Sequence, residues 1–221
     1  MVSRPQGGTG SDPENSIFDK TNLTNFCDAV MAIAITIIVL ELKVPDVPTA
    51  EINSQLWISL YNDSSVLIGY FLAFFILASY WKSYHKYMKY VNKVDDRFVI
   101  LNIFFIFFLA ILPFPTAIIC KYPAQTSPVI LYAVAISCSS IMQFLMWDYA
   151  SGKGRLTVDM DPRFRHAMHT RPLLNVALFL ISIPVAFISP LVSMVMWCLP
   201  FLITNYILHK VYRLDTAVSV S

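Results

Sequence analysis

Two carboxylates frame the first apolar segment of the sequence. Asp28 precedes and Glu41 follows residues 29–40, which are apolar except for Thr36. A helix of that length measures about 18 Å, well short of the roughly 30 Å hydrocarbon core of a bilayer. Carboxylates are costly against lipid, so we expect this helix to be surrounded by protein or to line a water-filled cavity. The alternative is that both ends reach the membrane interfaces, as the long side chain of Lys43 does readily.

The N-terminal end of this helix has its own signals. Thr24 is expected to cap the helix, which places Asp28 in or near the first turn, where the helix dipole stabilises a carboxylate. Capping and dipole stabilisation explain these two residues as well as a functional role does. The residues alone leave both interpretations open.

The composition is that of an integral membrane protein. Hydrophobic residues make up 57% of the chain, against about 45–50% in soluble domains, and the few charged residues cluster between apolar runs. A membrane-spanning helix needs roughly 20 apolar residues. The sequence therefore predicts an all-α membrane protein with six transmembrane helices per subunit, at residues 24–43, 64–88, 98–119, 127–149, 171–189 and 191–209.

The segments outside the spans complete the predicted organisation. We expect an N-terminal cytoplasmic segment at residues 1–21 without a cleavable signal peptide, a six-span domain at residues 22–212, and a C-terminal tail at residues 213–221. Residues 150–170 form the longest connector, and Ser189-Pro190 predicts a tight hairpin between the last two spans.

Basic residues predict the orientation in the membrane. With six spans, one side receives only Lys43 and Lys121. The other side receives the remaining 14 of the 16 basic residues: Arg4, Lys20, Lys82, Lys86, Lys89, Lys93, Arg97, Lys153, Arg155, Arg163, Arg165, Arg171, Lys210 and Arg213. Cytoplasmic loops carry an excess of Lys and Arg, so both termini are predicted to be cytoplasmic.

Other residue types exclude several functions. His166 and His169 form only a pair, so we expect no metal site and no cofactor. Because no catalytic or nucleotide-binding motif occurs, we expect no enzyme, and the net charge of +2 gives no reason to expect a nucleic-acid partner. The four cysteines are scattered and are interpreted as small buried hydrophobic residues: Cys27, Cys120, Cys138 and Cys198.

A series of motifs points to one family. Phe26-Cys27-Asp28-Ala29-Val30 is followed by AIAITIIVLELKVP, by Trp81-Lys-Ser-Tyr-His85, and by Asn102 and Leu112-Pro-Phe-Pro-Thr116. Together they resemble the endosomal/lysosomal potassium channel family (transmembrane protein 175), in particular its single-repeat prokaryotic members. The family signature is an Arg, three residues, then Phe-Ser-Asp. Here Asn22 holds the Arg position and Cys27 the Ser position, and Cys is a weak hydrogen-bond donor, so stability or gating is expected to differ.

The resemblance implies roles for the first span. It implies that four copies of this helix line a pore, with hydrophobic constrictions at Ile33, Ile37 and Leu40. At 100° per residue these three positions lie within about 60° of each other, and Asp28 lies about 140° from Ile33. Thr36 flanks the stripe, where its hydroxyl either faces the pore or bonds the Ala32 carbonyl. Periodicity alone selects no face, because residues 29–40 are apolar nearly all round.

The resemblance also implies a network that anchors the first helix. Its members are Asn22, Cys27, Asp28, Trp81, His85 and Asn102. For Trp81 the alternative is a place in an aromatic belt at the membrane interface, together with the neighbouring tyrosines.

These residues predict a function with one alternative. No carbonyl filter of the TVGYG type occurs, but narrow rings of Ile and Leu penalise ions that hold water tightly, which favours K⁺ over Na⁺. We therefore expect a homotetrameric, K⁺-selective channel in a bacterial plasma membrane, with K⁺ and the lipid bilayer as its partners. The alternative is a secondary transporter of a small cation or solute, which needs a polar site at mid-membrane. The polar candidates for such a site are few: Asn102, Gln143, Asn175 and Asn205.

Overall fold

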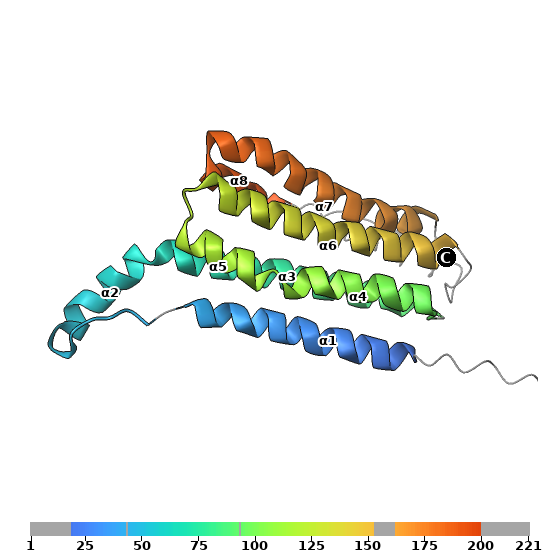
Figure 1. Cartoon of the computed structure of the whole chain (residues 1–221), viewed down its shortest axis with the longest axis horizontal. Coiled ribbons are helices and arrows are strands. Elements are labelled where there is room, and N and C mark those ends of the chain that lie inside the picture. The colour runs from blue at the N-terminus through green and yellow to red at the C-terminus, as the bar shows by residue number, and fades with distance from the viewer. Residues whose placement is uncertain (1–18, 43, 93, 153–161, 200–221) are drawn as a thin grey trace, which may run out of the picture.

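The computed structural model describes residues 19–42, 44–92, 94–152 and 162–199. The long helices lie side by side and run back and forth along one axis (Figure 1). The helical elements are α1 (Lys20–Ile37), η1 (Ile38–Glu41), η2 (Thr49–Glu51), α2 (Ile52–Asn62), α3 (Ser64–Tyr90), α4 (Asp96–Ala110), α5 (Pro113–Lys121), α6 (Thr126–Gly152), α7 (Pro162–Ile188) and α8 (Pro190–Met196).

Five segments among the described residues are long and apolar enough to cross a membrane. They are Lys20–Leu40, Val66–Tyr90, Asp96–Lys121, Thr126–Gly152 and Arg165–Ile188. Each overlaps one of the first five predicted spans. The predicted sixth span, residues 191–209, starts within α8, but its second half lies outside the described residues, so a sixth span stays a prediction.

The connector predicted at residues 150–170 is shorter in the structure. Helix α6 continues to Gly152, and α7 begins at Pro162, nine residues before the predicted start of the fifth span at Arg171. Proline fits the first turn of a helix because its missing N–H has no partner there anyway. The prediction missed this start because residues 162–170 are polar and carry no apolar run.

Prolines determine two further breaks. The third predicted span is divided in two, because α4 ends at Ala110 and α5 starts at Pro113. The hairpin predicted at Ser189-Pro190 is confirmed. Helix α7 ends at Ile188 and α8 starts at Pro190, with the Ser189 hydroxyl accepting a hydrogen bond from the backbone N–H of Val192 at 3.4 Å.

The loop after the first span contains a helix that the sequence did not predict. Helix α2 has no buried residue, and its Trp57 and Tyr61 side chains are exposed. It projects from one end of the bundle as an arm (Figure 1). Pro45 and Pro48 mark this region as a loop, but no proline follows them before the end of α2.

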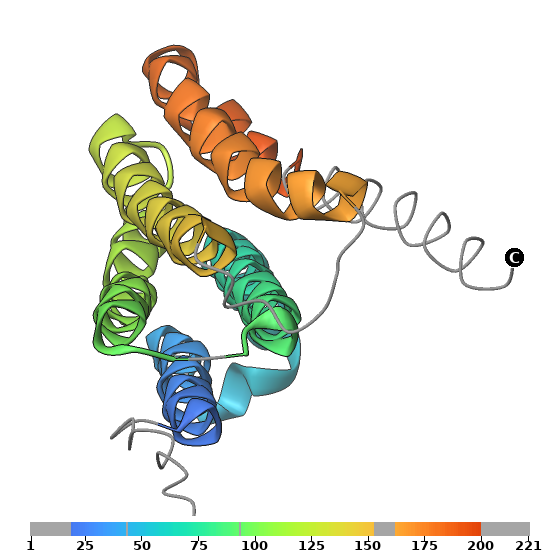
Figure 2. The same ribbon diagram turned by 90° about the vertical axis from the view of Figure 1, so that its right-hand side faces the viewer.

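Helix α6 lies at the centre of the bundle, packed against α4, α5 and α7 (Figure 2). Its Tyr132 and Trp147 side chains are almost fully buried. Hydrogen bonds tie the neighbouring helices together. The Trp197 indole N–H donates to the Ser182 hydroxyl at 2.9 Å, which links the end of α8 to α7. Helix α1 packs at the edge of the bundle, mainly against α3 and α4.

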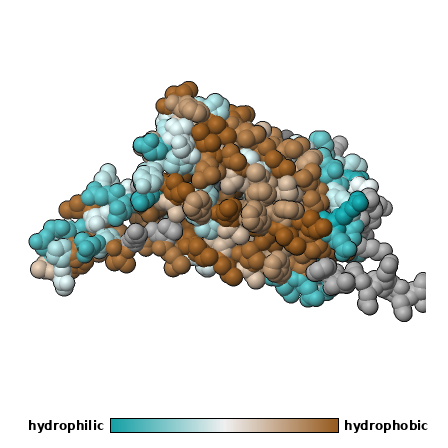
Figure 3. All heavy atoms as spheres, viewed as in Figure 1, coloured by the Kyte–Doolittle hydropathy of each residue, from teal (hydrophilic) through white to brown (hydrophobic). Residues whose placement is uncertain are grey.

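The surface separates into zones. An apolar belt covers the middle of the bundle, and hydrophilic residues gather at one end and on the α2 arm (Figure 3). The hydrophilic end is where α1 and α4 begin and α3 ends, and it is the side on which the sequence places most basic residues. This distribution matches a bundle with its axis across a bilayer.

Candidate pore helix and its anchor

Helix α1 has two faces with different surroundings. The face packed against the bundle carries Leu23, Cys27, Met31 and Ala34, which are all buried, and Ile38 in η1 continues it. The opposite face carries an apolar stripe that no other described residue covers. In this stripe Ile33, Ile37 and Leu40 are 57%, 42% and 75% exposed.

The structure shows which residues of α1 the bundle leaves exposed. All three residues of the expected constrictions lie on the exposed side of the first helix, and Val44 beyond η1 is exposed as well. Thr36 is also exposed, and its hydroxyl donates to the carbonyls of Ala32 at 3.0 Å and Ile33 at 2.9 Å. The alternative of a backbone bond for Thr36 is therefore realised in this structure.

The expected cap of α1 is wrong. The helix begins at Lys20 with Asp19 as its N-cap residue, and the Thr24 hydroxyl instead donates to the Lys20 carbonyl at 2.9 Å. Asp28 is therefore not in the first turn. It lies eight residues after Lys20, about 12 Å along the helix, so the helix dipole at the N-terminus does not account for its carboxylate.

Asp28 instead has partners from α3. The Trp81 indole N–H donates to one carboxylate oxygen at 3.0 Å, and Nε2 of His85 lies 3.4 Å from the other. The two rings of α3 contact each other, with centroids 4.6 Å apart, and the His85 Nδ1 lies 3.3 Å from the Trp81 carbonyl oxygen. The spacing of four residues places both side chains on one face of α3, opposite Asp28.

A second contact fixes the same stretch of α1 to α4. The Cys27 thiol donates to the Asn102 side-chain oxygen at 2.9 Å, and the Asn102 amide donates to the Tyr84 hydroxyl at 3.0 Å. Cys27 and Asn102 are fully buried and Tyr84 is nearly so. A buried amide that loses such a partner costs about 1–3 kcal/mol, so this chain of contacts constrains how α1 sits on the bundle.

The structure thus brings together five of the six residues expected in the anchoring network. Asp28 joins Trp81 and His85, while Cys27 joins Asn102. Asn22 is exposed and makes no side-chain hydrogen bond or ion pair within the described residues. The side chain of Glu41, the second carboxylate of the first segment, lies outside the described residues.

Tyr84 is a member of this network that sequence reasoning missed. It is the fourth residue of the Trp81–His85 motif, and the sequence suggested for it only the alternative of an aromatic belt at the membrane interface. The available signal was its place between Trp81 and His85, on a helix face that turns towards α4 as well as α1. Its ring stacks on Phe105 of α4, with centroids 5.8 Å apart and planes 18° apart.

His166 and His169, predicted to lie in a connector, are both part of α7. His169 Nε2 lies 3.2 Å from an Asp148 carboxylate oxygen, and its ring packs against Phe144 of α6, with centroids 4.6 Å apart. Within the described parts of the chain, no group of three or more His, Cys, Asp or Glu residues is placed to hold a metal ion.

Comparisons with known proteins point to one family. The family described as "Endosomal/lysosomal potassium channel TMEM175" matches residues 22–113. A protein of Streptomyces collinus named as a potassium channel is 28% identical over 142 residues, which cover 62% of this chain and 66% of that protein. One from Chryseobacterium, also named as a potassium channel, is 32% identical over 55% of this chain and 60% of its own length. The chain therefore spans about two thirds or less of these two relatives.

Vertebrate relatives carry a different name. The human endosomal/lysosomal proton channel TMEM175 is 22% identical over 79% of this chain, but the match covers only 34% of the human protein. The chain thus corresponds to about a third of the human sequence.

Solved structures show the same fold. A lysosomal potassium-selective channel TMEM175 homologue from Chamaesiphon minutus superposes with a TM-score of 0.71, at 23% identity, over 86% of this chain and 97% of that chain. A variant of the potassium channel MtTMEM175 superposes with a TM-score of 0.58 at 17% identity, over 92% of this chain. The chain therefore resembles the TMEM175 channel family over residues 22–113 and shares the fold of two solved TMEM175 structures.

Proposed function

We propose that this protein is a K⁺-permeable channel in which the exposed stripe of α1 lines the ion path. The observation that carries the proposal is the contrast between the two faces of α1. One face is fixed to α3 and α4 through Asp28 and Cys27, while the other presents Ile33, Ile37 and Leu40, which the rest of the described chain leaves exposed. An anchored helix with an uncovered apolar stripe is suited to meeting copies of itself around an axis.

The proposed assembly is a homotetramer. One α1 stripe cannot enclose a path, so several copies are needed, and cyclic symmetry would bring the same residues of each copy into rings. A channel role for this tetramer is supported by two relatives that are named as potassium channels. It is also supported by the fold shared with a solved TMEM175 homologue.

Selectivity in this proposal comes from dehydration. Rings of Ile33, Ile37 and Leu40 offer no oxygen ligands, and the Thr36 hydroxyl is already bonded to the backbone. A narrow apolar ring penalises the ion that holds its water more tightly, which is Na⁺. We therefore propose a K⁺ preference that is modest compared with that of a carbonyl filter, without a bound cofactor.

We place the protein in a bacterial plasma membrane with both termini in the cytoplasm. The excess of Lys and Arg at one side of the spans supports the orientation. The bacterial relatives named as potassium channels support the location.

The first test is passive flux through purified protein in liposomes. With K⁺ inside and an impermeant cation outside, we expect K⁺ efflux without any coupling gradient, and slower efflux when Na⁺ replaces K⁺. A proton-flux arm is included because the vertebrate relatives are named as proton channels. Flux that requires an opposing gradient would indicate the transporter instead, and proton flux without K⁺ flux would refute K⁺ permeation.

The second test addresses the stripe itself. Ile33→Asn places a polar amide in the proposed constriction and is expected to lower the K⁺/Na⁺ permeability ratio measured from reversal potentials. The matched control is Ile103→Asn, because Ile103 of α4 is similarly exposed, at 50%, but lies outside α1. An equal change in both variants, or none in Ile33→Asn, would refute the assigned selectivity role.

A further inference from the structure

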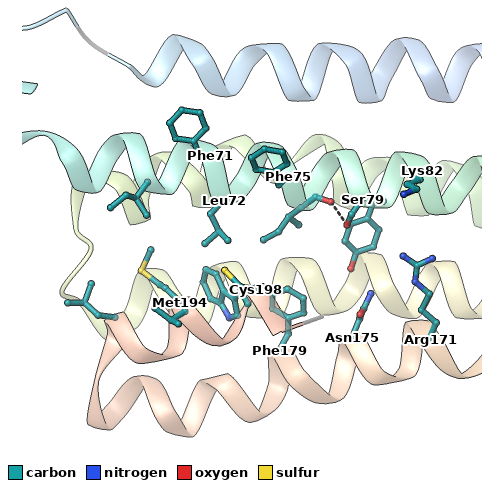
Figure 4. Close-up of a pocket in the computed structure, with 16 residues that line it drawn as sticks. Phe71, Leu72, Phe75, Ser79, Lys82, Arg171, Asn175, Phe179, Met194 and Cys198 are labelled. Atoms are coloured by element: carbon teal, nitrogen blue, oxygen red, sulfur yellow. Dashed lines mark hydrogen bonds between the residues drawn. The ribbon is translucent and has the colours of Figure 1, made fainter. Parts of the chain in front are cut away.

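A large cavity lies apart from α1, between α3 on one side and α7 and α8 on the other. Its volume is about 650 Å³, within the range of about 300–1,000 Å³ that is typical of small-molecule sites. Most of its wall is apolar and includes Phe71, Phe75, Phe179 and Met194 (Figure 4). It opens on the apolar middle of the protein, where a soluble polar ligand gains little.

One end of the cavity is different, because it carries two cations. Lys82 of α3 and Arg171 of α7 line it, and their nitrogen atoms face each other across the gap (Figure 4). Asn175 lies beside them, and none of the described residues that line the cavity is an Asp or Glu. Lys86 lies near enough to both to add a third positive charge to their surroundings.

Arg171 lacks the partners that a guanidinium needs. Its Nε and Nη1 atoms are buried and make no hydrogen bond. Among the described residues neither Arg171 nor Lys82 lies within ion-pair distance of a carboxylate, since the ion pairs there join His85 to Asp28 and His169 to Asp148. Removing a charge from water without a partner is costly, so this end is suited to an anion.

The depth of the two cations suits a lipid headgroup. Helices α3 and α7 each have 27 residues and measure about 40 Å, whereas the hydrocarbon core is about 30 Å thick. Lys82 lies about 12 Å from the C-terminal end of α3, and Arg171 about 13 Å from the N-terminal end of α7. With the excess of about 10 Å placed at the end of the bundle rich in basic residues, both lie within about 3 Å of the boundary between headgroups and acyl chains.

We propose that this cavity binds an anionic phospholipid, with its phosphate held by Arg171 and Lys82 and an acyl chain along the apolar wall towards Met194. A guanidinium offers several N–H donors in one plane and matches phosphate oxygens in pairs. Basic pockets between membrane helices at the cytoplasmic side are suited to such headgroups. The site is separate from α1, so this proposal does not depend on channel activity.

Native mass spectrometry of the purified, intact oligomer tests the proposal. Dioleoyl-phosphatidylglycerol and dioleoyl-phosphatidylcholine share their acyl chains and differ in net charge. We expect phosphatidylglycerol to bind the protein at a lower lipid concentration than phosphatidylcholine does. Arg171→Gln should weaken its binding at least about tenfold and Lys82→Gln about fivefold, because each removes a charged phosphate contact. Arg171→Lys should restore part of the loss.

Two further variants probe specificity and the apolar part of the site. Lys89→Gln, on the exposed last turn of α3 outside the cavity, should leave binding unchanged. Val195→Trp fills the apolar end and should weaken retention of both lipids, while the exposure of Val195 allows the fold to persist. If Arg171→Gln does not assemble, Lys82→Gln and Val195→Trp decide the question.

Several results would overturn the proposal. Equal retention of the two lipids would show that Arg171 and Lys82 do not favour a headgroup with a net negative charge. Competition by inorganic phosphate as effective as that by phosphatidylglycerol would identify a free anion as the ligand. Unchanged retention in Arg171→Gln, Lys82→Gln and Val195→Trp would show that another part of the protein, or a second copy, fills the cavity.

Discussion

Helices α1 and α6 are both apolar and long enough to span a membrane, but they are embedded in the chain to different degrees. Twelve of the 27 residues of α6 are buried, over about half of the helix circumference, whereas only four of the 18 residues of α1 are buried, all on one narrow face. Lipid tails are as apolar as these side chains, so the hydrophobic effect does not drive their burial inside a membrane protein. Burial here therefore indicates close packing between helices. The exposed stripe of α1 is therefore free of packing among the described residues, whereas α6 is held by its neighbours along its length.

The largest expected loss of stability comes from removing a buried side chain of α6. Trp147→Ala removes an almost fully buried ring that contacts Tyr87, with centroids 5.0 Å apart, and should lower the free energy of unfolding by about 3–5 kcal/mol. The counterpart in α1 is Ile33→Ala, which should change it by no more than about 0.5 kcal/mol. Denaturation of the purified proteins in mild detergent measures both. A similar loss in the two variants would show that α1 is as embedded as α6.

The next effect concerns the buried attachment of α1. Cys27→Ala leaves the Asn102 side-chain oxygen without its donor and should cost about 1–3 kcal/mol in the same measurement. Cys27→Ser restores a hydroxyl donor of similar size, so its stability should match or exceed that of the wild type. A Ser variant as unstable as the Ala variant would mean that thiol packing, and not the hydrogen bond, holds α1 to α4.

A smaller effect is expected from the half-exposed attachment. Asp28→Asn keeps an oxygen for the Trp81 indole but loses the charge beside His85, so we expect a loss of about 1 kcal/mol or less. The readouts are detergent denaturation and K⁺ flux, because a displaced α1 should alter flux more than stability. Trp81→Phe is a companion variant that removes the indole donor and keeps the ring. Wild-type flux in both variants would show that this contact does not position α1 for ion flux.

The smallest effect should come from Asn22. Asn22→Arg restores the residue of the family signature at an exposed position, and we expect a change in stability within about 0.5 kcal/mol. A stabilisation above 1 kcal/mol would show that the arginine finds a partner on the bundle, and would make the departure at this position a real weakening of the anchor.

The sequence allowed the spans to be predicted well, because long apolar runs determine membrane helices almost directly. It failed where helices are polar or exposed. Residues 162–170 and α2 form helices without an apolar run, and the break before Pro113 divides a run that looked continuous. The start of α1 was misplaced for the same reason, since Lys20–Asn22 are polar residues inside the helix.

The candidate site was likewise predicted only in part. Motif spacing placed Trp81 and His85 on one face and Asp28 away from the stripe, and the structure has these three in contact. Motif spacing did not indicate Tyr84, because the role of Tyr84 depends on the position of α4 relative to α3. The anion-binding end of the cavity also depends on tertiary structure, because Lys82 and Arg171 lie far apart in the sequence and come from helices that only the bundle brings together.

Thiol modification during current recording tests the central claim most directly. Ile37→Cys places a thiol on the exposed stripe, and Ala34→Cys places one on the buried face of the same turn, where the side chain is only 2% exposed. Wild-type protein controls for the four native cysteines. If α1 lines the path, a water-soluble, positively charged methanethiosulfonate reagent should block K⁺ current in Ile37→Cys and leave Ala34→Cys and the wild type conducting. Current that persists in modified Ile37→Cys would contradict the account, as would block that occurs equally in all three proteins.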